Sequence, residues 1–321
     1  MRSTMGRKGA QMGKGRLVIG DFRPGFGTGM VFGRRSRGGV PSRVPAEDSR
    51  RLGYRSSGEN ESLRGVVGRY GRGSWEGVLL GGRARRDGRL DQSERVSALP
   101  VSGYHVTETE IAGRDMLGID VGGARLHWRG ERWQWGGTVL GLEFSHPLDL
   151  RRDGRTPWGF VGRGQRLGAV DLRFNTDRGY GVLEMAGDDR GHWGIVGAAR
   201  IRAGGMRVRA HGRYYAPGFH SFFGGAPGAS GMKNELGGLA VLSGSRWHFF
   251  VDAYRRPKRS YFVPVAATYI TWGGAVQRQL GKDLRVRGQW QGRGRPRLQD
   301  GLLRQERSSR VRFGLDWASW R

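Results

Sequence analysis

The sequence contains no cysteine and little lysine. Zero cysteines among 321 residues exclude disulfides, thiolate metal ligands and a cysteine nucleophile. Lysine accounts for five of the 56 basic residues, so the other 51 are arginines. GC-rich codon usage explains that ratio, but it does not explain the net charge of +28. An excess of this size favours a polyanionic partner such as nucleic acid, phospholipid headgroups or lipopolysaccharide.

Long apolar runs are also missing. No stretch of about 18 apolar residues exists, which excludes a membrane-spanning helix. The longest uncharged, apolar-leaning run, 261–276, is broken by Pro264 and by Gly273-Gly274. Residues 1–15 are basic but lack the apolar core of a signal peptide. We therefore expect a basic tail over 1–15, with no signal peptide, followed by one domain over 16–321.

Glycine and aromatic residues are abundant. The chain has 60 glycines and 11 tryptophans. It shows no Gly-X-Y period, which excludes collagen, and its aromatic content argues against a disordered basic tail. Glycine, aromatic residues and alternating polar residues together are typical of β-barrels.

Apolar and polar residues alternate with period two, which predicts strands. Between Met206 and Tyr214, one set of alternate positions is apolar or small, and the other set is Arg207, Arg209, His211 and Arg213. The same split recurs over 170–175, 193–202, 284–291 and 310–317.

These segments predict an all-β fold, an antiparallel transmembrane up-and-down β-barrel. Their length of about ten residues matches transmembrane strands, and roughly fourteen to sixteen candidates follow one another between short turns. The C-terminus looks short of a closing strand, so we expect a barrel that is incomplete at its ends. A soluble sandwich is the alternative, with the apolar face against a second sheet and the arginines in water. Long consecutive strands with tryptophans near their ends favour the barrel.

The alternating arginines are the main functional candidates. Because an arginine facing lipid at the bilayer midplane costs roughly 2–4 kcal/mol, we expect them to face the lumen. Guanidinium groups there attract phosphates and carboxylates. The alternative is a static network of arginines and carboxylates, although bases outnumber acids two to one. The candidate anion-binding residues are Arg173, Arg200, Arg202, Arg207, Arg209, Arg213, Arg285, Arg287, Arg310 and Arg312.

Five short motifs add a family resemblance. They are Gly20-Asp21-Phe22 with 25–31, Ser56-Ser57-Gly58-Glu59 leading into Leu63-Arg64-Gly65, 103–107 with Glu110, Arg213-Tyr214-Tyr215 with 234–237, and 252–255 before Pro257. In this order they resemble the barrel region of bacterial helix-hairpin-helix (competence-type) proteins of Bacteroidetes-like lineages. In that family a DNA-binding helical region precedes an outer-membrane barrel. No such helical region precedes Gly20 here, and Phe22 and Thr28 replace an expected tyrosine and glutamine.

The resemblance draws attention to a set of polar residues. These are Glu59, Arg64, Tyr104, His105, Glu110, Asn234, Glu235 and Asp252. His105 and Glu110 suggest proton transfer, but a hydrogen-bonded network is the favoured interpretation. Ser56 and Ser57 lack a GxSxG motif, and the glycines of 25–29 lack the lysine of a phosphate loop. We therefore expect no catalytic residue, no metal site and no cofactor.

These observations rank three functions. The first is a bacterial outer-membrane barrel, a channel or a structural barrel, that handles anionic solutes and contacts the lipid bilayer and lipopolysaccharide. The second is an outer-membrane protein that binds or takes up DNA, as the resemblance implies. The third is a barrel hydrolase that uses His105 and Glu110.

Overall fold

The computed structural model describes residues 13–33, 48–49, 52–54, 62–100, 106–151, 157–229, 231–259, 263, 265–280, 284–299 and 302–317. It is almost entirely β-structure, with one five-residue helix, α1 (Glu108–Ala112). The strands are β1 (Lys14–Phe22), β2 (Leu63–Arg72), β3 (Trp75–Arg86), β4 (Arg89–Leu90), β5 (Val96–Ala98), β6 (Leu117–Arg129), β7 (Trp133–Asp149), β8 (Val161–Thr176), β9 (Gly179–Asp188), β10 (Trp193–Ala203), β11 (Met206–Tyr215), β12 (Glu235–Ser243), β13 (Trp247–Arg256), β14 (Ala267–Leu280), β15 (Leu284–Gln299) and β16 (Leu302–Trp317).

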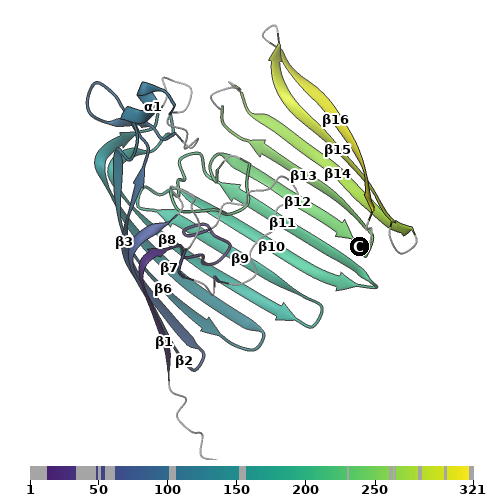
Figure 1. Cartoon of the computed structure of the whole chain (residues 1–321), viewed down its shortest axis with the longest axis horizontal. Coiled ribbons are helices and arrows are strands. Elements are labelled where there is room, and N and C mark those ends of the chain that lie inside the picture. The colour runs from purple at the N-terminus through teal and green to yellow at the C-terminus, as the bar shows by residue number, and fades with distance from the viewer. Residues whose placement is uncertain are drawn as a thin grey trace, which may run out of the picture.

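The strands form one antiparallel, up-and-down sheet. Apart from the short pair β4 and β5, each described strand pairs with the next one along the chain. The predicted all-β, antiparallel up-and-down architecture with fourteen to sixteen strands is therefore confirmed. Figure 1 shows that the sheet is strongly curved. Within the described residues β16 pairs only with β15, and β1 pairs only with β2 apart from a bridge between Phe22 and Gly53. Closure of the curve into a barrel stays a prediction.

The two ends of the sheet differ. At one end the strands are joined by tight turns, such as Gly204-Gly205 between β10 and β11. Both glycines have positive φ, 52° and 77°, as a two-residue hairpin turn requires. At the other end most connections are longer, as over 23–62, 87–116 and 216–234, although β9–β10 and β15–β16 are joined by short links. We call these the tight-turn end and the long-loop end.

The two faces of the sheet differ as well. Paired residues of adjacent strands point to the same side, so the register assigns each side chain to a face. Across the middle of the convex face most side chains are apolar or absent, and many are exposed. Leu79 on β3, Val139 on β7 and Val170 on β8 are 70%, 59% and 65% exposed.

The convex apolar surface has a border at each end. Near the tight-turn end lie aromatic rings. Trp75 and Trp135 pack edge to face at 5.2 Å, and the rings of Trp133 and Phe174 lie 4.4 Å apart. Toward the long-loop end a charged row crosses five adjacent strands, with each member opposite the next: Asp21, Arg64, Arg83, Asp120 and Glu143.

The concave face is filled in part by two connections, which we call the inner loops: residues 23–33 with 48–49 and 52–54, and residues 216–229 (Figure 1). They bind each other through backbone hydrogen bonds from Gly33 N to Phe223 O and from Gly225 N to Gly29 O. Their buried rings pack on the sheet, as Phe222 does on Phe144 of β7, with ring centroids 5.0 Å apart. Loops therefore cover the concave face where a sandwich would place a second sheet.

Candidate functional site

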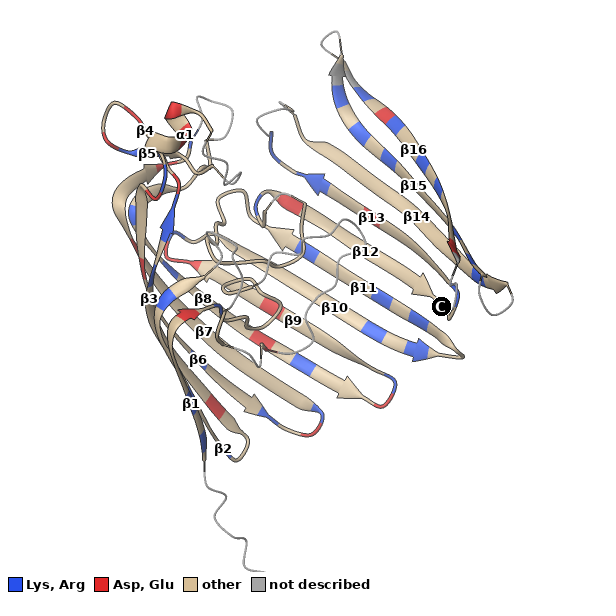
Figure 2. Ribbon diagram, viewed as in Figure 1, with Lys and Arg blue, Asp and Glu red and all other residues tan. Residues whose placement is uncertain are grey.

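The register places all ten candidate arginines on the concave face. On the β10–β11 hairpin, Arg200 lies opposite Arg209 and Arg202 opposite Arg207. On β15 and β16, Gln289 lies opposite Arg312 and Gln291 opposite Arg310. Figure 2 shows basic residues along β10, β11, β15 and β16. Their environments, however, differ: some are buried in ionic clusters, and others line a cavity or lie on exposed strands, and the cavity-lining arginines are called the open group below.

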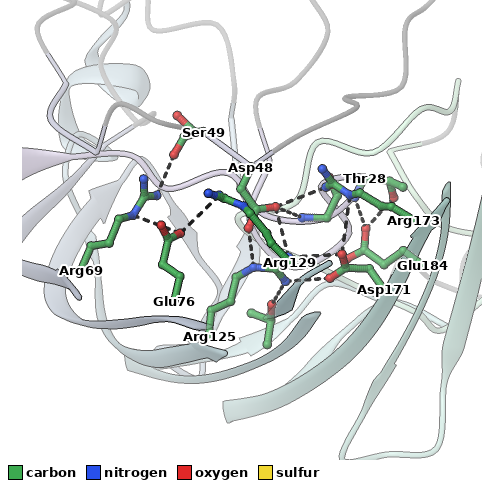
Figure 3. A network of polar contacts seen from close by, with 12 residues as sticks. Thr28, Asp48, Ser49, Arg69, Glu76, Arg125, Arg129, Asp171, Arg173 and Glu184 are labelled. Atoms are coloured by element: carbon green, nitrogen blue, oxygen red, sulfur yellow. Dashed lines mark hydrogen bonds and ion pairs between the residues drawn. The ribbon is translucent and has the colours of Figure 1, made fainter. Parts of the chain in front are cut away.

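Arg173 belongs to a buried ionic network around Asp48 (Figure 3). Asp48 comes from the first inner loop, and its carboxylate lies 2.6 Å from Nε of Arg125 on β6 and 3.2 Å from Nη2 of Arg173 on β8. The Arg125 guanidinium also contacts Asp171 Oδ2 at 2.7 Å. These four side chains are at most 3% exposed. Arg173 therefore forms ion pairs with carboxylates and has a structural role.

Burial raises the pKa of the Asp48 carboxyl, but the opposing effect of the Arg125 and Arg173 charges is larger. The pKa of Asp48 is therefore lowered overall. Asp48 is therefore an anion inside the fold. The backbone N–H of Gly27 donates to its Oδ1 at 3.0 Å. Asp48 thus links the inner loop to β6 and β8 by both charge and hydrogen bonds.

Thr28 provides a second link between this loop and the sheet. Its hydroxyl donates to Glu184 Oε2 on β9 at 2.6 Å, and its backbone N–H donates to the same oxygen. The neighbouring Gly27 has φ of +57°, and a Cβ there would lie 2.6 Å from that Glu184 oxygen. Glycine is therefore required beside this contact.

Arg213 belongs to a separate ionic cluster. Its guanidinium lies 2.5 Å from Glu235 Oε1 and 2.9 Å from Asp252 Oδ1. Glu235 also accepts from Ala229 N of the second inner loop at 2.9 Å. The Asn234 amide exchanges two hydrogen bonds with the backbone of Lys258, at 2.8 and 2.9 Å. Asn234 and Glu235 of the family-like set therefore anchor loops, and Arg213 is buried with the carboxylates of Glu235 and Asp252.

The open group of arginines lines a cavity at the tight-turn end. Its volume is about 570 Å³. Its basic lining residues are Arg200, Arg207, Arg209, Arg246 and Arg287, and its other polar or aromatic lining residues are Tyr180, His211, Ser243, Ser245, Trp247, His248, Gln277 and Gln289. None of the described residues that line it is acidic. The cavity is therefore strongly electropositive.

Like charges face each other at this cavity. Side chains directly opposite on an antiparallel pair lie roughly 4.5–5.5 Å apart at Cβ, and like charges there are destabilising. The β10–β11 hairpin places two such arginine pairs on consecutive positions of one face, Arg200 with Arg209 and Arg202 with Arg207. A bound anion would relieve this repulsion.

The remaining candidate arginines lie on the exposed strands β15 and β16. Arg287 reaches Asp316 at 3.8 Å, and Arg285 donates to Gln279 Oε1 at 3.3 Å. Arg310 and Arg312 are exposed on β16. Of these four, only Arg287 contributes to the described lining of the cavity.

The other family-like residues do not gather at one site. Glu59, Tyr104 and His105 lie outside the described residues. Arg64 lies on the convex face and pairs with Asp21 at 3.0 Å. Glu110 caps α1, and its carboxylate accepts from the backbone N–H groups of Val106 and Thr107, each at 3.1 Å. The Glu110 carboxylate therefore serves as part of a capping box at the start of α1.

Sequence reasoning missed Arg125, Asp171 and Arg246. Arg125 alternates with apolar residues in 124–129, so the period-two pattern carried a signal for it. Asp171 falls on the polar side of its alternating segment, but no pattern indicated that it would share Arg125 with Asp48, a carboxylate that a loop brings in. Arg246 lies in a turn, where alternation carries no information.

Searches with protein-family models, against curated proteins and against solved structures find no match for this chain. The described part of the chain holds no group of three histidine or carboxylate side chains placed to bind a metal ion. No described helix is long and apolar enough to cross a membrane. Fold and cavity therefore define the protein as an all-β protein with one curved antiparallel sheet and a basic concave face.

Proposed function

We propose that this chain is an outer-membrane β-barrel whose arginine-rich interior takes up or passes anionic solutes. The observation that carries the proposal is the contrast between the faces. The convex face exposes apolar side chains, whereas the concave face holds a cavity with five arginines and no acidic residue in its described lining. A water-soluble sheet has no need of an exposed apolar belt.

The dimensions of the belt support a bilayer environment. On β3 the convex side chains between Trp75 and Arg83 are Gly77, Leu79 and Gly81. At about 3.4 Å per residue this interval spans about 27 Å along the strand, or about 20 Å at the usual tilt of roughly 35–45°. Transmembrane barrels have an apolar band of about 25 Å between aromatic girdles.

The asymmetry of the sheet supports the same assignment. Bacterial outer-membrane barrels have short turns on the periplasmic side and long loops outside. This chain has tight turns at one end of its strands and mostly longer connections at the other. The arginine cavity would then lie toward the periplasm, with the long connections toward the exterior.

Planar-bilayer recording of the refolded chain tests the proposal. Under a salt gradient we expect a reversal potential that indicates anion preference. The double variant Arg200→Gln/Arg207→Gln should weaken that preference, whereas Arg64→Gln, on the convex face, should leave it unchanged. Absence of current, or a preference for cations, would contradict the channel function.

A further inference from the structure

The arginine cavity spans several strands, which restricts the size of its ligand. Its basic residues come from β10 and β11 on one side and from β15 on the other, with Arg246 in the turn before β13. Five inter-strand steps of about 4.8 Å separate β10 from β15, about 24 Å along the curved sheet. The arginines therefore reach the cavity from well-separated strands, an arrangement that suits a ligand with several anionic groups.

The lining also restricts the chemistry of the ligand. Guanidinium groups bind phosphate oxygens through paired, charge-assisted hydrogen bonds. The neutral lining residues Ser245, Gln277 and Gln289 add further hydrogen-bond donors. A phosphoryl group offers three acceptor oxygens and up to two charges, more than a carboxylate. Several phosphoryl groups in one molecule would match several arginines.

The position of the cavity indicates how a ligand enters. The lining includes the turn residues Gly244, Ser245 and Arg246, so the cavity lies at the tight-turn end. The first inner loop is anchored over other strands, because Asp48 fixes it to β6 and β8 and Thr28 fixes it to β9. A ligand therefore has access from the tight-turn end.

We propose that the cavity is a binding site for a compound with several phosphoryl groups, held between the arginines of β10–β11 and Arg287 of β15 and admitted at the tight-turn end. This inference rests on the anion-handling function proposed above and specifies its ligand. The volume of about 570 Å³ lies within the range of sites for small organic ligands.

Calorimetric titration of the full chain in detergent tests the inference. Orthophosphate, pyrophosphate and tripolyphosphate are compared at matched ionic strength. We expect the affinity to rise by about tenfold or more from orthophosphate to tripolyphosphate, because each added contact of about 1.4 kcal/mol contributes a factor of ten. Equal affinities for the three probes would overturn the inference.

Matched variants distinguish binding in the cavity from general electrostatic attraction. Arg200→Gln/Arg207→Gln should weaken tripolyphosphate binding by about tenfold or more. Arg310→Gln/Arg312→Gln removes the same charge from the same face outside the described lining and should leave binding unchanged. Equal losses in both variants would identify diffuse electrostatic attraction and overturn the inference. Circular dichroism confirms that each variant is folded.

This test also distinguishes the ligand assignment from the proposed channel function. Titration in detergent requires no current. Anion-selective current without a preference for tripolyphosphate would overturn the ligand assignment alone. Selective tripolyphosphate binding without current would contradict the channel function alone.

Discussion

Asp48 and Arg125 are joined across 77 residues of sequence by a 2.6 Å ion pair in which both side chains are almost fully buried. Asp48 belongs to an inner loop and Arg125 to β6, so the pair fixes the loop to the concave face. Asp171 and Arg173 extend the same cluster to β8. The inner loops are therefore a bound part of the fold, and their removal would expose buried charges.

Replacement of this carboxylate should destabilise the protein strongly. Asp48→Asn keeps the shape but leaves Arg125 and Arg173 with less compensating charge. Breaking a buried pair costs about 3–5 kcal/mol, and we expect a loss of this size in guanidinium unfolding followed by tryptophan fluorescence. The matched change Asp120→Asn breaks the exposed pair with Arg83 and should cost less than about 1 kcal/mol. Similar losses in the two variants would contradict the assigned role of Asp48.

The hydroxyl of Thr28 should contribute separately to loop anchoring. Thr28→Val removes the donor to Glu184 while it keeps the side-chain shape, and we expect a loss of about 1.5–3 kcal/mol. Thr28→Ser retains the hydroxyl and should keep most of the stability. Limited proteolysis of the inner loops provides the readout, with faster cleavage expected for the valine variant. If serine and valine behave alike, the hydrogen bond does not anchor the loop.

Acidification should loosen the second inner loop through His220. Burial lowers the pKa of this histidine to about 4, although the hydrogen bond to Gly218 O opposes the shift. Its ordinary value is near 6.5, so the unfolded state binds the proton first as the pH falls. The stability that His220 contributes is complete above about pH 6.5 and decreases toward pH 4, at up to about 1.4 kcal/mol per pH unit.

The measurement is the free energy of unfolding between pH 7.5 and pH 4.5, compared between the wild type and His220→Gln. We expect a shallower pH dependence in the variant across this window. Asp48 has a lowered pKa, so its contribution persists until the pH falls below its ordinary value near 3.9. Parallel curves for the two proteins would show that His220 is not the group that titrates.

A charge in the convex belt should prevent insertion into a bilayer. Val170 lies at the middle of β8 and is 65% exposed. Val170→Arg should cost about 2–4 kcal/mol if this face contacts lipid. Refolding into lipid vesicles, followed by protease protection, measures the effect. Val106→Arg, at an exposed position in the long connection between β3 and β6, should insert normally. Normal insertion of both variants would contradict a lipid-facing belt.

The strands could be predicted because alternation depends only on local sequence. In β11, Arg207, Arg209, His211 and Arg213 were assigned to one face, and the register places them there. The tight turn at Gly204-Gly205 was predicted for the same reason, since glycine tolerates positive φ. The different environments of these arginines could not be predicted. Arg213 is buried with Glu235 and Asp252, whereas Arg207 lines the open cavity.

By itself, the sequence determined the strand order, the two faces and the excess of cationic groups, because period-two alternation and short turns constrain a chain locally. Only the tertiary structure decided which arginines are neutralised and which are open. That division depends on loops such as 23–33 with Asp48, which fold back over the sheet and carry carboxylates to distant strands. The energy of an ion pair depends on the distance between the two charges. The separation of two residues along the sequence does not reveal this distance.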